Sequence, residues 1–358
     1  MKIVIDENIP LAEFLFSPLG DVQLLPGRTL SADQVSDADA LLVRSVTQVN
    51  QALLENSRVK FVGSATIGTD HIDLDWLQKN NITFSAAPGC NANSVAEYVL
   101  VALLEAANKN AFNLDEKKLA IVGFGNVGQA VAKKMSAFVA SVSVCDPPLL
   151  ATANPPVGNY VDLAEVTKAD IVCCHTPLVK RGEHATYHLI DEDFISSLKP
   201  GCVLLNAGRG GVIDEMALLR RIRNRGDLTV ILDVWDGEPD VNRELLNEVF
   251  IGTPHIAGYS VQGKTTGSWM VYAAFCECFG IEMISEELFV QETVSKEQLV
   301  AGATLLETVR KVYDIWRDDK ALRNSHSVGD FDGLRKNYPG RKEFSAYQVE
   351  GSQLDIFG

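Results

Sequence analysis

Several side chains in the second half of this sequence suit acid–base chemistry on an alcohol that carries a carboxylate. Arg209 follows one short apolar run, and Asp233 ends another. Glu238 lies in a Trp-Asp-Gly-Glu-Pro segment, and His255 lies in a Thr-Pro-His-Ile-Ala-Gly segment. An imidazole exchanges protons near neutral pH, a carboxylate orients it, and a guanidinium binds a carboxylate in a bidentate manner. Together they suit oxidation of a hydroxyacid, although each residue alone also has an ordinary structural explanation.

A glycine-rich segment at residues 123–128 suits binding of a pyrophosphate. It reads Gly-x-Gly-x-x-Gly, follows a short apolar run and precedes a helical pattern. Gly123 permits a tight turn, Gly125 lets backbone N–H groups approach the phosphates, and Gly128 lets helix and strand pack closely. The motif therefore predicts a dinucleotide site, with a purely structural turn as the alternative.

One acidic residue, Asp146, ends the next apolar run after the glycine segment. A carboxylate there accepts hydrogen bonds from the adenosine ribose and repels a 2′-phosphate. Pro147 and Pro148 follow it, and no arginine adjoins it. This pattern favours NAD over NADP.

These residues require a parallel sheet whose carboxyl ends gather them. From Lys118 onward, β-branched runs alternate with helical stretches, which predicts a doubly wound sheet. The predicted strands are 119–122, 142–145, 171–174, 203–206, 230–233 and 250–252. A helix is expected from Asp214 to Asn224, with Asp214 as its N-cap and Gly226 just beyond its end.

The rest of the chain predicts a second α/β region and a helical end. Short apolar runs at 2–5, 22–25, 40–43, 59–62 and 82–84 indicate another parallel sheet. Ser94 and Glu97 form the pattern of a capping box that opens a helix to about Ala107. Apolar spacing predicts one amphipathic helix from Glu297 to Trp316, followed by a polar tail with strand-like pieces.

Composition limits the classes of function. The 358 residues are 46% hydrophobic and 22% charged with a net charge of −15, typical of a globular protein that does not bind nucleic acid. The first apolar run is too short for a signal peptide, and no stretch is long enough to span a membrane. Seven cysteines without a Cys-x-x-Cys pair indicate neither a disulfide framework nor a metal site. We expect a cytoplasmic protein.

The motifs together resemble those of the D-isomer-specific 2-hydroxyacid dehydrogenases over about residues 1–280. The matching segments are Gly123-Phe124-Gly125-Asn126-Val127-Gly128, Asn206-Ala207-Gly208-Arg209-Gly210, Leu232-Asp233-Val234-Trp235 with Glu238-Pro239, and Thr253-Pro254-His255-Ile256-Ala257-Gly258. The resemblance implies a flavodoxin-like substrate domain (1–93 and 258–287), a Rossmann NAD domain (94–257) and a small α+β dimerisation domain (288–358).

Further segments resemble one branch of this family, whose substrate is a phosphorylated sugar acid, and extend the resemblance over the whole chain. They are Asp6-Glu7-Asn8-Ile9-Pro10, Val43-Arg44-Ser45-Val46-Thr47, Ser85-Ala86-Ala87-Pro88-Gly89-Cys90-Asn91-Ala92, His255-Ile256-Ala257-Gly258-Tyr259-Ser260, and Phe331-Asp332-Gly333-Leu334-Arg335-Lys336-Asn337-Tyr338-Pro339. The resemblance implies a homodimer that binds NAD and a small phosphorylated hydroxyacid.

Residue roles follow from the resemblance. Arg209, Glu238 and His255 are then catalytic, with His255 the proton donor and acceptor. Ser45, Thr66 and Tyr259 are expected to bind substrate. NAD is expected to bind at Gly123, Gly125, Asn126, Val127, Gly128, Asp146, Thr176, Ala207, Arg209, Asp233 and Gly258. Thr66 lies where many relatives have a Gly-x-Gly element, and a threonine there suits a polyhydroxylated substrate.

Cations for the substrate phosphate and the choice of substrate stay open at this point. Arg44 and a C-terminal cluster (Arg335, Lys336, Arg341, Lys342) are candidates, and a solvated basic tail explains the cluster equally well. Another hydroxyacid, such as glycerate or 3-phosphoglycerate, is an alternative substrate. A protein that binds NAD as a signal without catalysis is a third reading, which the combination of an acid–base pair and Arg209 disfavours.

Overall fold

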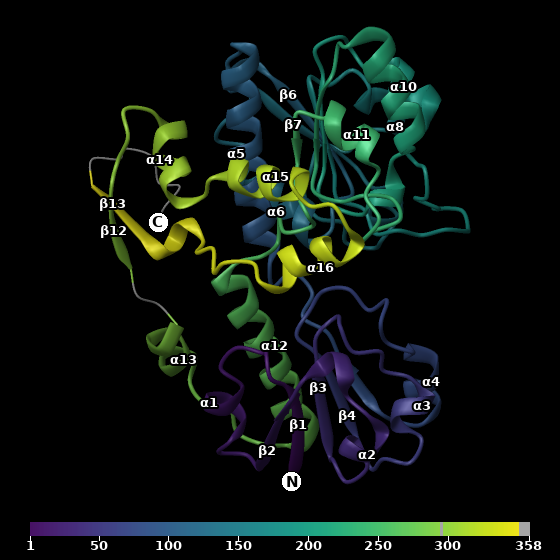
Figure 1. Cartoon of the computed structure of the whole chain (residues 1–358), viewed down its shortest axis with the longest axis vertical. Coiled ribbons are helices and arrows are strands. Elements are labelled where there is room, and N and C mark those ends of the chain that lie inside the picture. The colour runs from purple at the N-terminus through teal and green to yellow at the C-terminus, as the bar shows by residue number, and fades with distance from the viewer. Residues whose placement is uncertain (294–295, 351–358) are drawn as a thin grey trace. The chain divides into compact units, whose positions relative to one another are not determined.

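The computed structural model describes residues 1–293 and 296–350, and the chain forms two compact units (Figure 1). The first unit contains Met1–Asn91 and Ser260–Lys296, and the second contains Ala92–Tyr259 and Glu297–Gly358. No helix among the described residues is both long enough and apolar enough to cross a membrane.

The first unit is built on a parallel sheet of five strands in the order β2-β1-β3-β4-β5, which is the flavodoxin-like order. Its strands are β1 (Lys2–Asp6), β2 (Asp21–Leu25), β3 (Ala40–Val43), β4 (Phe61–Ser64) and β5 (Thr83–Ser85). Its helices are α1 (Ala12–Phe16), α2 (Ala32–Val35), α3 (Gln51–Leu54), α4 (Leu74–Lys79), α12 (Val261–Phe279) and α13 (Glu286–Thr293). The five expected strands are therefore present, with two of them shifted by one or two residues.

Alternate residues of these strands enter separate cores on the two faces of the sheet. Ile3 and Ile5 pack in one cluster, whereas Val4 packs in the other. Helix α12 covers the first face, where a Cβ on Gly63 of β4 would lie 2.4 Å from a methyl carbon of Val271. The glycine thus permits a close approach of helix and strand.

The second unit contains a six-stranded parallel sheet in the order β11-β10-β9-β8-β6-β7. The strands are β6 (Lys118–Val122), β7 (Ser141–Cys145), β8 (Ile171–Cys174), β9 (Val203–Asn206), β10 (Thr229–Leu232) and β11 (Ile251–Gly252). A single parallel bridge joins Val144 to Tyr160. This bridge occupies the place of a strand beyond β7, so the bridge, β7, β6, β8, β9 and β10 follow the dinucleotide-binding order 3-2-1-4-5-6, and β11 is a further strand beyond β10. The predicted fold class, two doubly wound α/β sheets with a small C-terminal part, is confirmed.

Helices cover both faces of this sheet. Helices α5 (Ala92–Asn110) and α6 (Asn126–Met135) form one core with alternate strand residues such as Leu119 and Ile121. The other face packs against the short helices of the remaining connections. These are α8 (Leu163–Val166), α9 (Glu192–Ser197), α10 (Glu215–Arg225) and α11 (Arg243–Glu248), with α7 (Pro147–Leu150) just after β7. Asp214 caps α10 and Gly226 ends it with φ +59°, as the sequence predicts.

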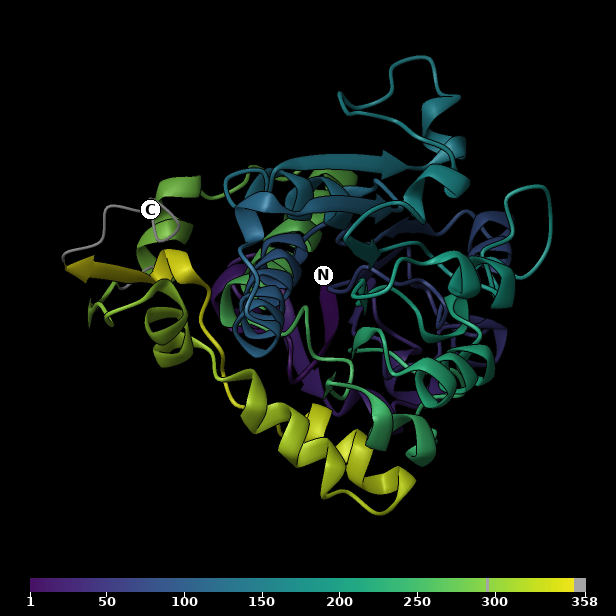
Figure 2. The same cartoon turned by 90° about the horizontal axis from the view of Figure 1, so that it is seen from above.

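The C-terminal segment belongs to the second unit. It contains β12 (Glu297–Val300), α14 (Leu305–Val312), α15 (Ile315–Arg323), α16 (Val328–Lys336) and β13 (Tyr347–Glu350). Strands β12 and β13 pair in parallel next to α14, and Figure 2 shows α15 and α16 along one side of the unit, in yellow-green and yellow. Several hydrogen bonds join the segment to the rest of the unit, among them the following. Arg310 forms two 2.6 Å hydrogen bonds with Glu105 of α5, and the Gly252 N–H of β11 donates to Asp319 Oδ1 at 2.8 Å.

Two predictions about helices are wrong. The expected helix from Glu297 to Trp316 is instead a strand followed by two helices, because Thr304 and Asp314 each cap a new helix and β12 pairs with β13. The expected N-cap Ser94 lies inside α5, which begins at Ala92. Its hydroxyl donates to Glu343 at 2.6 Å, a contact with a distant segment that local spacing does not reveal.

Candidate active site

An imidazole–carboxylate pair lies at the carboxyl edge of the second unit's sheet. His255 follows β11, and Glu238 lies in the loop after β10. His255 Nδ1 and Glu238 Oε2 are 2.7 Å apart, while Glu238 Oε1 accepts the Trp235 N–H at 2.8 Å. Burial alone would raise the pKa of Glu238, but the charge and hydrogen bond of His255, the Trp235 hydrogen bond and the charge of Arg335 together lower it. His255 keeps 29% of its side chain exposed.

The backbone around His255 is held by Asp233. His255 has φ +56°, a conformation that non-glycine residues seldom adopt, and its N–H donates to the Asp233 carbonyl at 2.7 Å. The Asp233 carboxylate accepts the N–H groups of Ile256 and Ala257, each at 2.9 Å, and the Thr253 hydroxyl at 2.6 Å. Burial raises the pKa of Asp233, although His255 and these hydrogen bonds oppose that effect. The strained turn is thus over-determined by its surroundings, as functional loops commonly are.

The loop that carries Arg209 packs against the loop that carries Glu238. A Cβ on Gly210 would lie 1.9 Å from the Trp235 carbonyl carbon, so the two backbones are in direct contact. The half-buried Arg209 side chain donates to the Gly208 carbonyl at 2.9 Å, and Asn206 donates to the Arg209 carbonyl at the same distance. The structure therefore brings together the loops of the three predicted catalytic residues.

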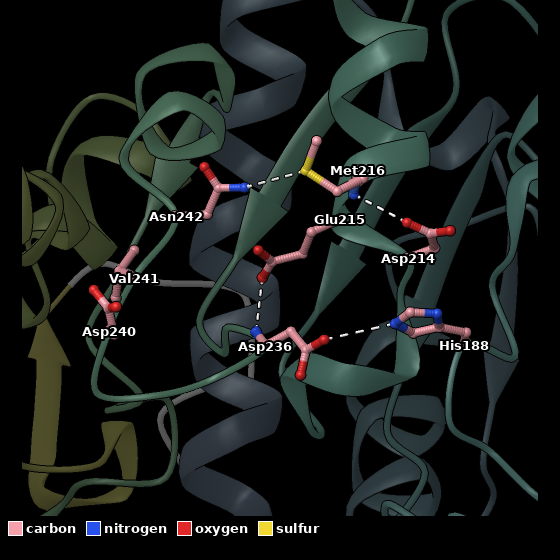
Figure 3. A pocket seen from close by; sticks show the side chains of 8 residues that line it. All are labelled: His188, Asp214, Glu215, Met216, Asp236, Asp240, Val241 and Asn242. Atoms are coloured by element: carbon pink, nitrogen blue, oxygen red, sulfur yellow. Dashed lines mark hydrogen bonds and ion pairs between the residues drawn. The ribbon is translucent and has the colours of Figure 1, made fainter.

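Glu215, the first residue of α10, also supports this loop and escaped sequence reasoning. It lines a surface cavity of about 320 Å³ together with His188 and Asp236 (Figure 3). Its Oε1 accepts the Asp236 N–H at 2.7 Å, two residues before Glu238. Burial raises the pKa of Glu215 to about 7, with smaller contributions from the charges of Asp236 and Glu238. A glutamate in the first turn of a helix is common, so its spacing carries no functional signal.

The glycine loop has the geometry of a phosphate cradle. Gly123 has φ +92°, and a Cβ there would lie 2.8 Å from backbone atoms of His175 and Thr176. A Cβ on Gly128 would lie 2.1 Å from the Gly123 carbonyl oxygen. At Gly125, the N-cap of α6, a Cβ would meet no described atom within 4 Å. Packing thus requires glycine at two positions, and the third leaves space at a helix N-terminus, where a pyrophosphate fits.

Asp146 lies beside this loop. Its Oδ2 accepts the Phe124 N–H at 2.7 Å, and its Oδ1 accepts the Leu149 N–H at 3.0 Å. A carboxylate oxygen can accept two hydrogen bonds, so each oxygen of Asp146 can still accept one from a ribose hydroxyl. The residues present therefore suit the adenosine side of a dinucleotide.

Unpartnered polar atoms lie next to the glycine loop. Thr176 Oγ1 and both ring nitrogens of His175 are buried without a hydrogen-bond partner among the described residues. Burial lowers the pKa of His175 to about 4. Gly208 packs on the backbone of His175 and Thr176, and its neighbour Ala207 donates its N–H to the Cys174 carbonyl at 3.3 Å. Because native proteins rarely leave buried polar atoms unpaired, these groups fit a site that a polar cofactor completes.

Tyr259 and Gly258 follow His255 in the same loop. The Tyr259 ring is half-buried and lies edge-on to Tyr338, with ring centres 5.7 Å apart. Tyr259 donates its N–H to the Ile256 carbonyl at 2.8 Å. The loop thus places an aromatic side chain four residues beyond the candidate base.

The other two predicted substrate residues belong to the first unit, where Ser45 follows β3 and Thr66 follows the adjacent β4. The Thr66 hydroxyl lies 2.8 Å from that of Ser64, which lies 3.1 Å from His71 Nε2. Burial lowers the pKa of His71. Ser45 is exposed, and its neighbour Arg44 forms an ion pair at 3.2 Å with the buried Asp6. Within the described residues, no group of three or more potential ligands could hold a metal ion.

Two family models match this chain. Residues 100–257 match the model described as D-isomer specific 2-hydroxyacid dehydrogenase, NAD binding domain. Residues 288–356 match a domain of unknown function, DUF3410. The second match coincides with the C-terminal segment and says nothing of its role.

Curated relatives match nearly the whole chain. An erythronate-4-phosphate dehydrogenase of Klebsiella pneumoniae (strain 342) is 48% identical over 98% of this chain and 94% of its own length. One of Tolumonas auensis is 45% identical, covering 99% of this chain and 96% of its own length.

Solved structures with the same fold include NAD-bound 3-phosphoglycerate dehydrogenase of Entamoeba histolytica. It is 26% identical with a TM-score of 0.66, covering 78% of this chain and 95% of that one. D-lactate dehydrogenase of Aquifex aeolicus, complexed with NAD and lactic acid, has a TM-score of 0.60 and 23% identity, covering 82% of this chain and 98% of its own. The latter supports the fold alone.

Proposed function

This chain belongs to the family of the erythronate-4-phosphate dehydrogenases, within the D-isomer-specific 2-hydroxyacid dehydrogenases, and we propose that it oxidises 4-phospho-D-erythronate at C2. It is an NAD-dependent oxidoreductase. The product would be 2-oxo-3-hydroxy-4-phosphobutanoate, and the reaction would serve pyridoxal phosphate (vitamin B6) biosynthesis. The names of the curated relatives support the substrate, and the geometry around His255 supports the chemistry.

The 2.7 Å contact between His255 Nδ1 and Glu238 Oε2 is the observation that carries this proposal. An ionised Glu238 accepts a hydrogen bond from Nδ1–H, which leaves Nε2 as the unprotonated atom. His255 Nε2 then takes the proton of the substrate C2 hydroxyl, and Glu238 stabilises the imidazolium that forms. The lowered pKa of Glu238 keeps this carboxylate ionised at neutral pH.

Arg209 is assigned to the carboxylate next to the reacting carbon, C2. Its guanidinium binds the C1 carboxylate in a bidentate manner and stabilises the negative charge that develops on the C2 oxygen. The contact of Gly210 with Trp235 fixes the distance between its loop and that of Glu238. NAD supplies the hydride acceptor.

Cofactor binding is assigned to the glycine loop and its neighbours. The backbone of residues 123–128 binds the pyrophosphate at the N-terminus of α6, and Asp146 binds the adenosine ribose. Thr176, Ala207, Asp233 and Gly258 are assigned to NAD on the family resemblance, and the Asp233 carboxylate also accepts the Ile256 and Ala257 N–H groups beside His255. The orphaned Thr176 hydroxyl supports this assignment, because a bound polar group would satisfy it.

Ser45, Thr66 and Tyr259 are assigned to the substrate on the resemblance stated above. Their hydroxyl groups suit the polyol part of a sugar acid. The C-terminal segment is assigned to a homodimer interface, and the mass of the full-length protein in solution tests that assignment. A monomer at assay concentration would refute it.

NADH formation with a panel of acids tests the proposed function. The panel contains 4-phospho-D-erythronate, 3-phosphoglycerate and glycerate. We expect the highest kcat/KM with 4-phospho-D-erythronate. A higher value with another acid reassigns the substrate, and binding of NAD without turnover of any acid favours a sensor.

A further inference from the structure

The C-terminal segment brings a cation to the loop that carries His255. Arg335 lies in the last turn of α16, where its guanidinium carbon is 5.8 Å from the centre of the Tyr259 ring. It lies 5.9 Å from the ring of Phe331, a buried residue one turn earlier on the same helix. Phe331 thus fixes the helix in the core while the guanidinium faces the active-site tyrosine.

The guanidinium of Arg335 is not fully satisfied by the part of the protein that the structure describes. Its Nε is buried and has no hydrogen-bond partner within residues 1–293 and 296–350. Two neighbouring cations of the segment point to other partners. Arg341 is buried over the Tyr313 ring, 4.4 Å from its centre, and donates from Nη2 to the Ala257 carbonyl at 2.6 Å, although its Nε and Nη1 also have no partner among the described residues. Lys342 pairs with Glu297 at 2.5 Å. A buried donor that is left unpaired costs free energy, so a partner for Arg335 is expected from beyond the described residues.

The position of Arg335 also limits what that partner is. Its charge contributes to lowering the pKa of Glu238 against the effect of burial, after the larger contributions of His255 and the Trp235 hydrogen bond. It therefore acts on the same site as the catalytic pair. An anion at Arg335 would lie next to Tyr259, in the loop that carries His255.

We propose that Arg335 binds the phosphate of the substrate, an inference that rests on the function proposed above. A planar guanidinium offers a fork of N–H donors that matches a phosphate, and its charge is fixed at all physiological pH values. Arg209 then binds the carboxylate end of the acid and Arg335 the phosphate end. In this arrangement the C-terminal segment takes part in substrate selection. Arg209 alone would bind the carboxylate of any hydroxyacid, and Arg335 adds the preference for a phosphorylated one.

The first test compares two substrates in three variants. Arg335→Met and Arg335→Lys are assayed with 4-phospho-D-erythronate and with unphosphorylated D-erythronate, and Lys336→Met is the matched control because it removes an exposed charge from the adjacent position. We expect the ratio of kcat/KM for the two acids to fall about 10- to 100-fold in Arg335→Met, in line with the loss of a charge-assisted hydrogen bond. Arg335→Lys should recover part of the ratio, and Lys336→Met should keep it. Equal losses with both acids would overturn the proposal.

The second test is independent of turnover. Inorganic phosphate is titrated calorimetrically into the protein saturated with NAD, so that the glycine loop is occupied. Weaker phosphate binding in Arg335→Met than in the unmodified protein and in Lys336→Met supports the proposal. This result would stand even if the unmodified protein did not oxidise 4-phospho-D-erythronate and the proposed function were therefore wrong. Equal binding in all three proteins overturns it. Thermal unfolding confirms that each variant is folded.

Discussion

Replacing Glu238 with glutamine should abolish most of the turnover while leaving the protein folded and able to bind NAD. The side-chain carbonyl of the introduced glutamine can keep the hydrogen bond from Trp235 N–H, which the glutamate accepts at 2.8 Å. Its amide then donates toward His255 Nδ1, 2.7 Å away in the native pair, and forces the proton onto Nε2. An imidazole with Nε2–H cannot accept the C2 hydroxyl proton. The charge that stabilises the imidazolium is lost as well.

The size of this effect follows from the catalysis that is removed. General acid–base catalysis contributes about 10²- to 10⁴-fold, so kcat should fall by that factor, or roughly 3 to 5 kcal/mol of barrier. NADH formation measures kcat, and quenching of intrinsic fluorescence measures the dissociation constant of NAD. Asp236→Asn is the matched control. It removes a carboxylate from the same loop, and the Asp236 side chain contacts His188 rather than His255. Retention of kcat within about threefold in Glu238→Gln, or an equal loss in the control, would refute the assigned role of Glu238.

Other residues give further expectations. Asp146→Ala should reduce the preference for NAD over NADP by about tenfold or more in kcat/KM, because the repulsion of a 2′-phosphate is removed; an unchanged ratio would contradict the ribose contact. Arg44 pairs with Asp6 at 3.2 Å and the phosphate is assigned to Arg335, so Arg44→Ala should change KM for 4-phospho-D-erythronate and D-erythronate by similar factors; a larger rise for the phosphorylated acid would contradict this and give Arg44 a phosphate contact. Burial, followed by the charge of Glu343, raises the pKa of Glu97 from 4.5 to about 7, so the folded state holds a proton that the unfolded chain has released between these values. The free energy of unfolding should therefore fall by roughly 3 kcal/mol as pH rises through that window, and Glu97→Gln should lack this loss. Urea unfolding at about pH 5 and about pH 8 measures it, and parallel pH dependences of the two proteins would contradict the expectation.

The strands and one helix were predictable because their signals are local. Apolar β-branched runs defined the parallel strands, and Asp214 with Gly226 defined both ends of α10. The glycine loop was predictable for the same reason, because each glycine meets a local steric demand. His255 and Glu238 were recognisable as a combination, and the structure adds the hydrogen bond that joins them.

The failures arose where distant segments decide the structure. Thr304 and Asp314 could equally lie on the polar face of one long helix, and only the pairing of β12 with β13 and two new caps divide the segment. Ser94 resembled an N-cap, but Glu343 from the C-terminal segment claims its hydroxyl. Glu215 was missed because its contact with the Asp236 N–H joins two loops that are separate in the sequence.

Transfer of isotope from the substrate tests the central claim most directly. The protein is supplied with NAD and 4-phospho-D-erythronate that carries deuterium at C2, and the NADH is analysed by mass spectrometry. If the chain oxidises the C2 alcohol, the deuterium appears in the NADH in an amount equal to the NADH formed, and His255→Asn forms almost none. Unlabelled NADH, or no NADH from this acid, would contradict the account.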